Sequence, residues 1–221
     1  MNDILDLIKS RRTIKNFLPK YVSWEKISRI IDAGRHAPCS GNIQNWRFIV
    51  VNDDDTKYKI SEACYEQYDI VKATLIIVCS EPDKVERYYG LRGERLYSIQ
   101  NCAAAIQNMI LETQSLGLGS RWIGAFEEED LKALLNIPDS VRPQAILAVG
   151  HYDANPEKPP KYPLEVITFF GRWKGRLIDP AKYCNETSTI MARKFKAASE
   201  GIKETTEKIK ETISEKINSG K

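Results

Sequence analysis

Apolar residues along the first 170 positions recur with the periods of helices and strands. Four segments have apolar residues at helical spacing, which predicts helices at 4–9, 24–34, 99–116 and 127–135. Five short runs rich in β-branched and aromatic residues predict strands or extended segments at 46–51, 75–79, 120–126, 143–149 and 164–170. Strands spread among helices in this way predict an α+β fold with four or five strands.

Two of these segments are expected at the centre of the fold. The run 75–79 is continuously apolar, which is typical of a central strand covered on both faces. The segment 99–116 has a wide apolar face with small residues along it, which is typical of a buried helix. Both segments therefore belong to one core.

The composition of the chain changes after residue 186. The segment 187–221 has no proline, and Phe195, Ile202, Ile209 and Ile213 lie at helical spacing, which predicts an amphipathic helix. We expect one domain over 1–186 and a helical extension over 187–221. We expect the extension to pack on its own dimer; the alternatives are a partly disordered helix, a short coiled coil and a helix on a membrane surface. Membrane binding has the least support, because Phe195 is its only aromatic residue.

Composition and charge exclude several classes of protein. The chain of 221 residues is 42% hydrophobic and 29% charged, which is ordinary for a globular protein. Five widely spaced cysteines without a C-x-x-C pair indicate a reducing compartment, and two histidines without ligand spacing argue against a metal site. No secretory signal and no apolar run of about 20 residues is present. We therefore expect a cytoplasmic protein that does not contact the membrane.

Three short motifs carry candidate chemistry. The run Arg11-Arg12-Thr13-x-Lys15 gathers cations and a hydroxyl at a helix end, where it either holds a phosphate or forms a solvated basic face. The turn 38–44 has amide side chains suited to the edge of a heteroaromatic ring, although by itself it is also an ordinary loop. The glycines of 117–125 let a backbone approach a ligand closely. Each motif alone is weakly specific.

Several common catalytic motifs are missing from the sequence. It has no G-x-G-x-x-G after a strand, no P-loop and no G-x-S-x-G. These absences argue against a Rossmann dinucleotide site, a nucleoside triphosphatase and a triad hydrolase. The basic excess in the first 50 residues leaves open a nucleic-acid surface, although phosphate binding explains it better.

Five sequence blocks that follow one another in a fixed order are together far more specific than any single motif. They are the N-terminal basic run, the turn P-x-S-G-N-x-Q leading into W-R-F, the alanine-rich helix, the segment G-L-G-S-R-W-I-G-A-F and a final K-x-P-L. In this order they resemble the nitroreductase family of flavin enzymes over residues 3–174. The resemblance implies an intertwined homodimer with a mixed or antiparallel sheet flanked by helices. It also implies FMN at the subunit interface, with both chains contributing to each site.

The resemblance assigns cofactor contacts residue by residue. Arg11 and Thr13 match residues that hold the FMN phosphate, Arg12 lies between them, and Lys161 matches a second phosphate-binding cation. Lys15 matches a basic residue near the flavin N1/O2 edge, where reduction places negative charge. The remaining expected contacts are the partner-donated Pro38, Cys39, Ser40, Asn42 and Gln44, and the ring-covering Trp122, Ile123, Gly124 and Ala125, with the Gly124 N–H at flavin N5.

This sequence also departs from the family pattern. Cys39 stands where serine is common, and Asn45 replaces the usual proline before Trp46. Asn101 stands where aspartate is frequent, and Pro159 where a second basic residue is sometimes found. None of these departures removes the expected flavin site.

The implied function is ping-pong hydride transfer. NADH or NADPH reduces FMN, and an electron-poor acceptor such as a nitroaromatic, a quinone or a free flavin then takes the hydride. The cofactor carries the chemistry, so no catalytic side chain is expected. The segment 81–97 falls where the family places a variable cover, and we expect Tyr88 and Tyr89 to stack on the substrate while Arg92 or Arg95 binds its anionic group. The alternatives are a solvated helix at 81–97, and a flavin storage or sensor protein without turnover.

Overall fold

The computed structural model of the chain describes residues 3–154 and 156–175. The chain divides into two compact units, Met1–Lys158 and Pro159–Lys221. The elements of the first unit are α1 (Ile4–Ser10), α2 (Trp24–Arg35), β1 (Trp46–Val51), α3 (Asp54–Ala63), β2 (Thr74–Ser80), α4 (Pro82–Arg92), α5 (Ser98–Ser115), β3 (Gly119–Ile123), α6 (Glu128–Leu135) and β4 (Arg142–Gly150). The described part of the second unit holds the short helix α7 (Leu164–Ile167).

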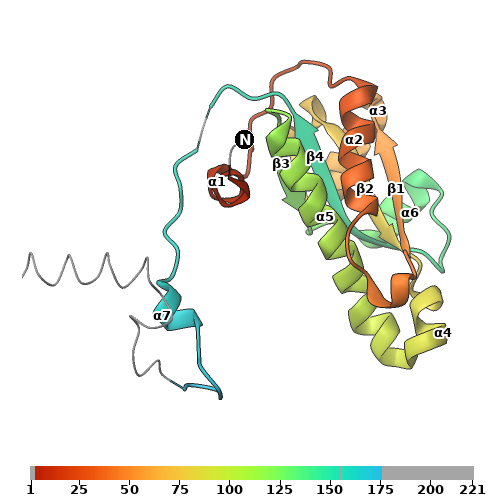
Figure 1. The fold of residues 1–221 in the computed structure, drawn as a ribbon. Coiled ribbons are helices and arrows are strands. Elements are labelled where there is room, and N and C mark those ends of the chain that lie inside the picture. The colour runs from red at the N-terminus through yellow and green to blue at the C-terminus, as the bar shows by residue number, and fades with distance from the viewer. Residues whose placement is uncertain (1–2, 155, 176–221) are drawn as a thin grey trace, which may run out of the picture. The chain divides into compact units, whose positions relative to one another are not determined.

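The first unit is built on a four-stranded sheet in the order β1-β2-β4-β3. Every neighbouring pair of strands is antiparallel, as Figure 1 shows. In the register Val50 lies opposite Ile76, and Ile77 opposite Ile146. These strands confirm the α+β prediction and the four strands predicted between residues 46 and 149.

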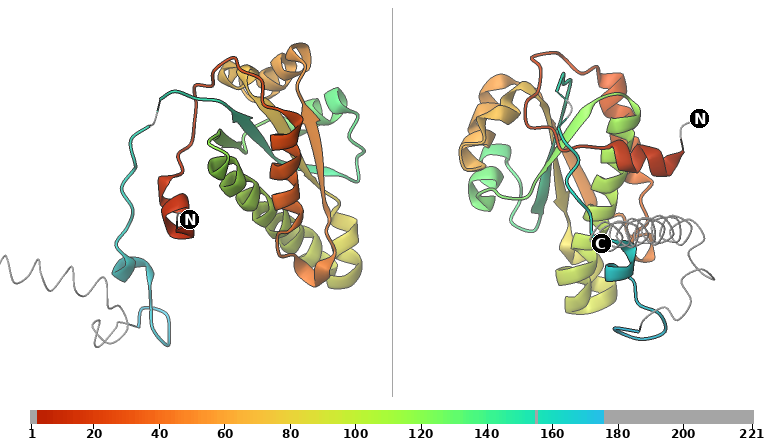
Figure 2. Two further views of the ribbon diagram at one scale, coloured as in Figure 1. Left: turned by 45° about the horizontal axis from the view of Figure 1, so that its top comes forward. Right: turned by 90° about the vertical axis from the view of Figure 1, so that its left-hand side faces the viewer.

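Helices cover both faces of this sheet (Figures 1 and 2). The helices α2 and α5 lie side by side on one face, and α3 and α6 lie on the other. Alternate residues of β2 enter the two layers: Ile76 and Val78 pack with α2 and α5, whereas Leu75 and Ile77 pack with α3 and α6. Every residue of β2 is buried, which confirms the prediction of a central strand covered on both faces.

Helix α3 shows how a weak apolar pattern becomes a helix. The sequence pattern did not predict it, because only Ile60, Ala63 and the adjoining Cys64 supply apolar surface to the core. The carboxylate of Asp53 accepts a hydrogen bond from the Thr56 N–H (2.8 Å), which satisfies a free donor of the first turn. Hydrogen bonding from the Thr56 side chain, together with this backbone bond, lowers the pKa of Asp53.

One predicted element is wrong. The run 164–170 is not an extended segment: it begins with the single helical turn α7 and continues through bends. Pro163 immediately before Leu164 explains the helical start, because proline fits the first positions of a helix. The boundary after residue 186 and the helix predicted at 187–221 lie outside the described residues.

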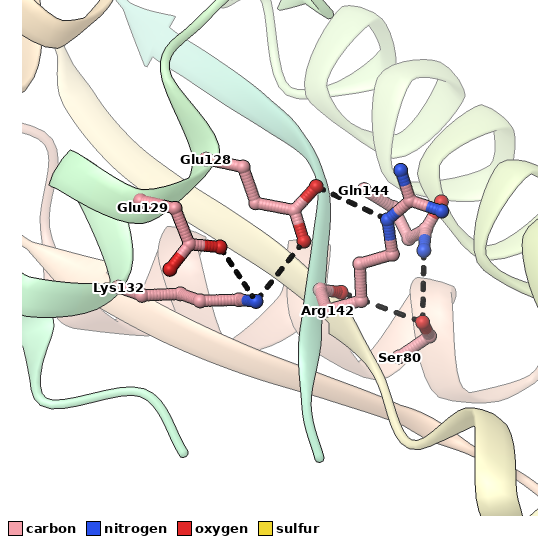
Figure 3. Close-up of polar contacts among 6 residues, drawn as sticks. All are labelled: Ser80, Glu128, Glu129, Lys132, Arg142 and Gln144. Atoms are coloured by element: carbon pink, nitrogen blue, oxygen red, sulfur yellow. Dashed lines mark hydrogen bonds and ion pairs between the residues drawn. The ribbon is translucent and has the colours of Figure 1, made fainter. Parts of the chain in front are cut away.

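A polar cluster joins α6 to the sheet, as Figure 3 shows. Lys132 Nζ lies 3.3 Å from carboxylate oxygens of both Glu128 and Glu129, and Arg142 Nε lies 3.1 Å from Glu128. Gln144 donates to the Ser80 hydroxyl at 2.9 Å and thereby links β4 to β2. We assign this cluster a structural role.

Among the described helices, none has the length and hydropathy needed to cross a membrane.

Candidate functional site

The segment that carries the first candidate motif is tied to the sheet through its backbone. The Ile14 N–H donates to the Ser120 carbonyl on β3 (3.0 Å), and the Leu18 N–H donates to the His151 carbonyl just after β4 (2.8 Å). Ile14 and Phe17, each 3% exposed, point into the core. Residues between these anchors therefore have fixed positions, and Lys15 is exposed.

Two glycines make room for this segment. A Cβ at Gly119 would lie 2.6 Å from Ile14 Cγ1, and a Cβ at Gly150 would lie 2.7 Å from Phe17 Cδ1. Such distances are too short for carbon atoms in a close-packed interior. The glycine at 119 thus admits Ile14 rather than a ligand, which corrects the sequence-based expectation for this position.

The side chains of the basic run separate into two groups. Arg12 Nη1 donates to the carbonyls of Lys9 (2.9 Å), Ser10 (3.1 Å) and Arg11 (2.9 Å), and Arg12 Nε donates to the Pro156 carbonyl (3.2 Å). These bonds satisfy carbonyls at the end of α1.

Among the described residues, the Arg11 side chain donates only to the Thr13 hydroxyl, at 3.5 Å. Lys15 has no hydrogen bond or ion pair with any residue that the structure describes. Arg11 and Lys15 are therefore the cations of this block that are available to an anionic ligand.

The turn 38–45 is fixed to the other end of α5 by buried amides. Asn101 Oδ1 accepts from the Ser40 N–H (3.0 Å) and the Ser40 hydroxyl (3.3 Å), and Asn101 Nδ2 donates to Asn45 Oδ1 (2.8 Å). Asn101 is 3% exposed and Asn45 is fully buried. The two departures from the family pattern are thus hydrogen-bond partners. An aspartate at 101 would direct a carboxylate oxygen at the Asn45 carbonyl oxygen.

The tip of this turn holds the polar side chains of the second candidate motif. Asn42 and Gln44 are exposed, both have positive φ (56° and 51°), and Gln44 Nε2 donates to Asn42 Oδ1 at 3.1 Å. Pro38 is exposed, whereas Cys39 and Ser40 are half-buried. The backbone conformation of Gly41, with φ 56°, belongs to the same bend.

The end of β3 presents an open backbone. A Cβ at Gly124 would meet nothing closer than Trp122 Nε1 at 3.9 Å. Trp122 is 42% exposed and Ala125 is exposed, whereas Ile123 is buried in the core. Arg121 is held by an ion pair with Asp69 and a hydrogen bond to Gln67, which fixes this strand. A ligand above Gly124 would reach backbone and indole here, and Ile123 would contribute through its backbone alone.

Helix α4 and the turn form the walls of a pocket of about 460 Å³. Tyr88 and Tyr89 line it, as the sequence-based hypothesis requires of substrate contacts, but Arg92 and Arg95 do not. Arg92 Nε donates to the Tyr97 hydroxyl at 3.0 Å. Sequence reasoning missed Lys84 and Arg87, which line the pocket. Lys84 precedes Arg87 by three residues and Tyr88 by four, which places them on one helix face, and this spacing was the available signal.

The two halves of the candidate site lie at opposite ends of α5 (Figure 1). Ser40 is bonded to Asn101 near the start of the helix, and the Ser10 hydroxyl accepts from Gln114 near its end (3.4 Å). Thirteen residues of helix correspond to about 20 Å. A single chain does not bring 38–44 together with 11–15. Lys161 is exposed in the second unit.

Buried thiols and metal-ligand clusters do not add a second reactive centre. Burial raises the pKa of Cys64 to about 11, and it raises those of Cys79 and Cys102 to about 12. These three thiols are therefore protonated and unreactive at neutral pH. The described part of the chain also holds no group of three metal-ligating side chains.

Comparison with known proteins gives one consistent result. The model of the nitroreductase family matches residues 8–84 and 72–151. A protein of Archaeoglobus fulgidus with the provisional name NADH dehydrogenase/NAD(P)H nitroreductase is 34% identical over 157 residues, which are 68% of this chain and 86% of that protein. An FMN reductase [NAD(P)H] of Bacillus subtilis is 29% identical over 76% of this chain and 73% of its own length. The crystal structure of a nitroreductase family protein from Clostridium difficile 630 superposes with a TM-score of 0.68 at 28% identity, over 78% of this chain and 100% of that one.

Proposed function

Because the chain belongs to the nitroreductase family, we propose that it is an FMN-dependent enzyme that transfers a hydride from NAD(P)H to an electron-poor acceptor by a ping-pong mechanism. FMN, when bound, supplies the hydride-transfer chemistry. The protein's own task is then to hold the cofactor, to place donor and acceptor on the same side of it, and to stabilise charge.

The residues of the first unit fit the phosphate end of such a cofactor. Arg11 and Thr13 offer a guanidinium and a hydroxyl side by side, and no backbone acceptor in the described part of the chain competes for Arg11. Arg12 instead organises the end of α1, so we assign it a positioning role. We keep Lys161 as a proposed second cation for the phosphate.

The ring end of the cofactor fits three other features. Lys15, which pairs with no described residue, places a cation on a fixed backbone, where it would stabilise negative charge that develops on the ring. Gly124 offers an N–H in open space, and Ser40, Asn42 and Gln44 offer polar groups on a rigid turn. The observation that carries the proposal is the combination of Arg11 and Lys15, which form no ion pair with any described residue, with an open glycine at the end of β3.

We also propose that each site is shared between two copies of the chain. Residues 11–15 and 38–44 lie at opposite ends of α5, so a second copy is needed to bring one set to the other. Helix α1 buries none of its residues, and Ile4 is 71% exposed. The described part of the second unit separately exposes Tyr162, Leu164, Val166, Ile167, Phe169, Phe170 and Trp173. Apolar exposure on this scale is typical of surfaces that another subunit covers.

The first test asks whether the protein binds and reduces FMN. The purified protein should be yellow, release FMN on denaturation, and lose its visible absorbance within seconds of mixing with NADH or NADPH under anaerobic conditions. A colourless protein that FMN cannot reconstitute would refute the proposal. A yellow protein that stays yellow under excess of both nucleotides would instead indicate flavin storage or sensing.

The second test asks whether the site is shared. One variant carries Arg11→Ala and Lys15→Ala, and the other carries Asn101→Ala to release the turn. Each homodimer should bind FMN poorly. A heterodimer purified through two different tags should hold one FMN per dimer, because one of its two sites combines intact halves from both chains. A heterodimer as empty as the parents would show that both halves serve the same chain's site.

A further inference from the structure

The pocket between α4 and the turn adjoins the residues proposed to touch the flavin. It is lined by Gly41, Asn42, Ile43, Lys84, Arg87, Tyr88 and Tyr89. Its volume of about 460 Å³ lies in the range of small-molecule sites. Asn42 belongs both to this wall and to the proposed cofactor contacts, so a molecule in the pocket would lie next to the cofactor.

One wall of the pocket is rigid. The Tyr89 hydroxyl packs against Gly41, where a Cβ would lie only 2.8 Å away. The Tyr89 ring meets the Tyr97 ring edge to face, with centroids 5.4 Å apart. Arg92 fixes Tyr97 by a hydrogen bond of 3.0 Å. Tyr88, by contrast, is 71% exposed and free to cover a planar ligand.

The charge on this wall is positive. Glu81 lies between Arg47 Nη2 (2.5 Å) and Lys84 Nζ (2.8 Å), so its one negative charge faces two cations. Arg87 adds a third cation that has no hydrogen bond or ion pair with any described residue. The other acidic residues of α4, Asp83 and Glu86, do not line the pocket.

We propose that this pocket binds the electron acceptor and selects planar aromatic compounds that carry a carboxylate. Arg87 would bind the carboxylate, Lys84 would add positive potential, and Tyr88 would stack on the ring. The volume suits one or two fused rings. The inference rests on the proposed function, because it concerns the acceptor of that reaction. It replaces Arg92 and Arg95 by Arg87 as the anion ligand.

Binding of unreactive ligands tests the inference without turnover. On the FMN-loaded protein, calorimetry would compare benzoate with benzamide, which has nearly the same shape but no charge. Arg87→Ala should weaken benzoate binding about tenfold, the scale of one charge-assisted hydrogen bond, and leave benzamide unchanged. Arg87→Lys should retain part of the preference, and Arg95→Ala should retain all of it. Equal binding of both ligands by the unaltered protein, or a preference that depends on Arg95, would overturn the proposal.

Turnover supplies the second readout. With 4-nitrobenzoate or 4-nitrobenzamide, one cycle takes a hydride from NAD(P)H and a proton from solvent, converts the nitro group to a nitroso group and releases water. The ratio of the two kcat/KM values should fall about tenfold in Arg87→Ala, whereas the kcat/KM for NADPH should not change, because in a ping-pong mechanism it reports only the reduction of the flavin. A fall in the kcat/KM for NADPH with an unchanged acceptor ratio would assign the pocket to the nucleotide and overturn the proposal. If NADPH still reduces the flavin of this variant normally, the proposed function stands. Either outcome then concerns the acceptor pocket alone.

Discussion

The two ends of α5 hold the two halves of the candidate site in different ways. At its start, the turn 38–45 is fixed by side chains, since Asn101 binds both Ser40 and Asn45 in a buried amide network. At its end, the segment 11–18 is fixed by backbone hydrogen bonds to Ser120 and His151 and by close packing.

This difference separates the residues that fix the backbone from the residues whose side chains are left to bind a ligand. In the segment 11–18 the backbone and two buried side chains do the holding, so the side chains of Arg11 and Lys15 are left for a ligand. In the turn, Ser40 is both an anchor and a proposed ligand contact. Substitutions at the two ends should therefore affect stability and FMN binding in different proportions.

The largest effect is expected where the segment 11–18 packs most closely. Gly119→Ala would place a Cβ 2.6 Å from Ile14 and 2.8 Å from Tyr152. Overpacking of this kind should lower the free energy of unfolding by about 2 kcal/mol and weaken FMN binding. Gly124→Ala is the matched control, because its Cβ meets nothing closer than 3.9 Å and should leave stability unchanged. Urea denaturation of both variants measures the difference, and equal midpoints would contradict the proposed packing.

The amide network at the other end should couple stability to cofactor binding. Asn101→Ala leaves the Ser40 N–H and the Asn45 side chain without their partner, which should cost about 1.5 kcal/mol. Because the turn loosens, FMN should also bind about tenfold more weakly. Cys102→Ala, at a fully buried neighbour whose thiol donates to the Cys79 carbonyl on β2, is the control: it should lower stability without changing FMN affinity per folded molecule.

The network also predicts a non-additive pair. If Asn45 and Asn101 act through their shared hydrogen bond, Asn45→Ala should cost less in the Asn101→Ala background than in the unaltered protein. Strict additivity of the two free energies of unfolding would show that they stabilise the turn independently.

Within the basic run, we expect one cation to contribute to stability and another to contribute to FMN binding. Arg12→Ala removes the bonds to carbonyls at the end of α1 and should lower stability by about 1 kcal/mol. Lys15→Ala should leave the melting temperature unchanged and weaken FMN binding about tenfold, since Lys15 has no partner among the described residues. Thermal melts of the flavin-free proteins and FMN titrations check both; the reverse result would exchange the two roles.

The sequence predicts the core better than it predicts the site. The continuous apolar run of β2 and the wide apolar face of α5 depend on local pattern, and both elements lie within one or two residues of their predicted bounds. Helix α3 escaped prediction because its start depends on one capping carboxylate and its core contacts are few. The chain bends after α7, and the apolar residues of the run 164–170 do not predict these bends.

The site depends on contacts between residues that are distant in sequence. Family resemblance identified the motifs, but it could not show that Asn45 and Asn101, 56 residues apart, bind each other. Nor could the basic run alone show that Arg12 faces carbonyls while Lys15 stays free, because this depends on where α1 ends. The roles of Lys84 and Arg87 likewise require the turn to lie beside α4.

The smallest expected effect is a pH dependence of stability that is confined to the segment 11–18, at the end of α5. Burial lowers the pKa of His151, and the charges of Lys20 and Lys26 lower it further. The folded protein therefore binds fewer protons than the unfolded chain, so stability should be constant above pH 7. It should fall by less than about 1 kcal/mol as pH drops below about 6.5. His151→Gln should abolish this part of the pH dependence.

Hydrogen exchange would locate that response. The Leu18 N–H is bonded to the His151 carbonyl, so below pH 6.5 it should lose more protection than the general dependence of exchange on pH explains. The Ser40 N–H is bonded to the amide of Asn101, which does not titrate, and should keep its protection. Equal loss at both amides would show that the two ends of α5 respond as one unit.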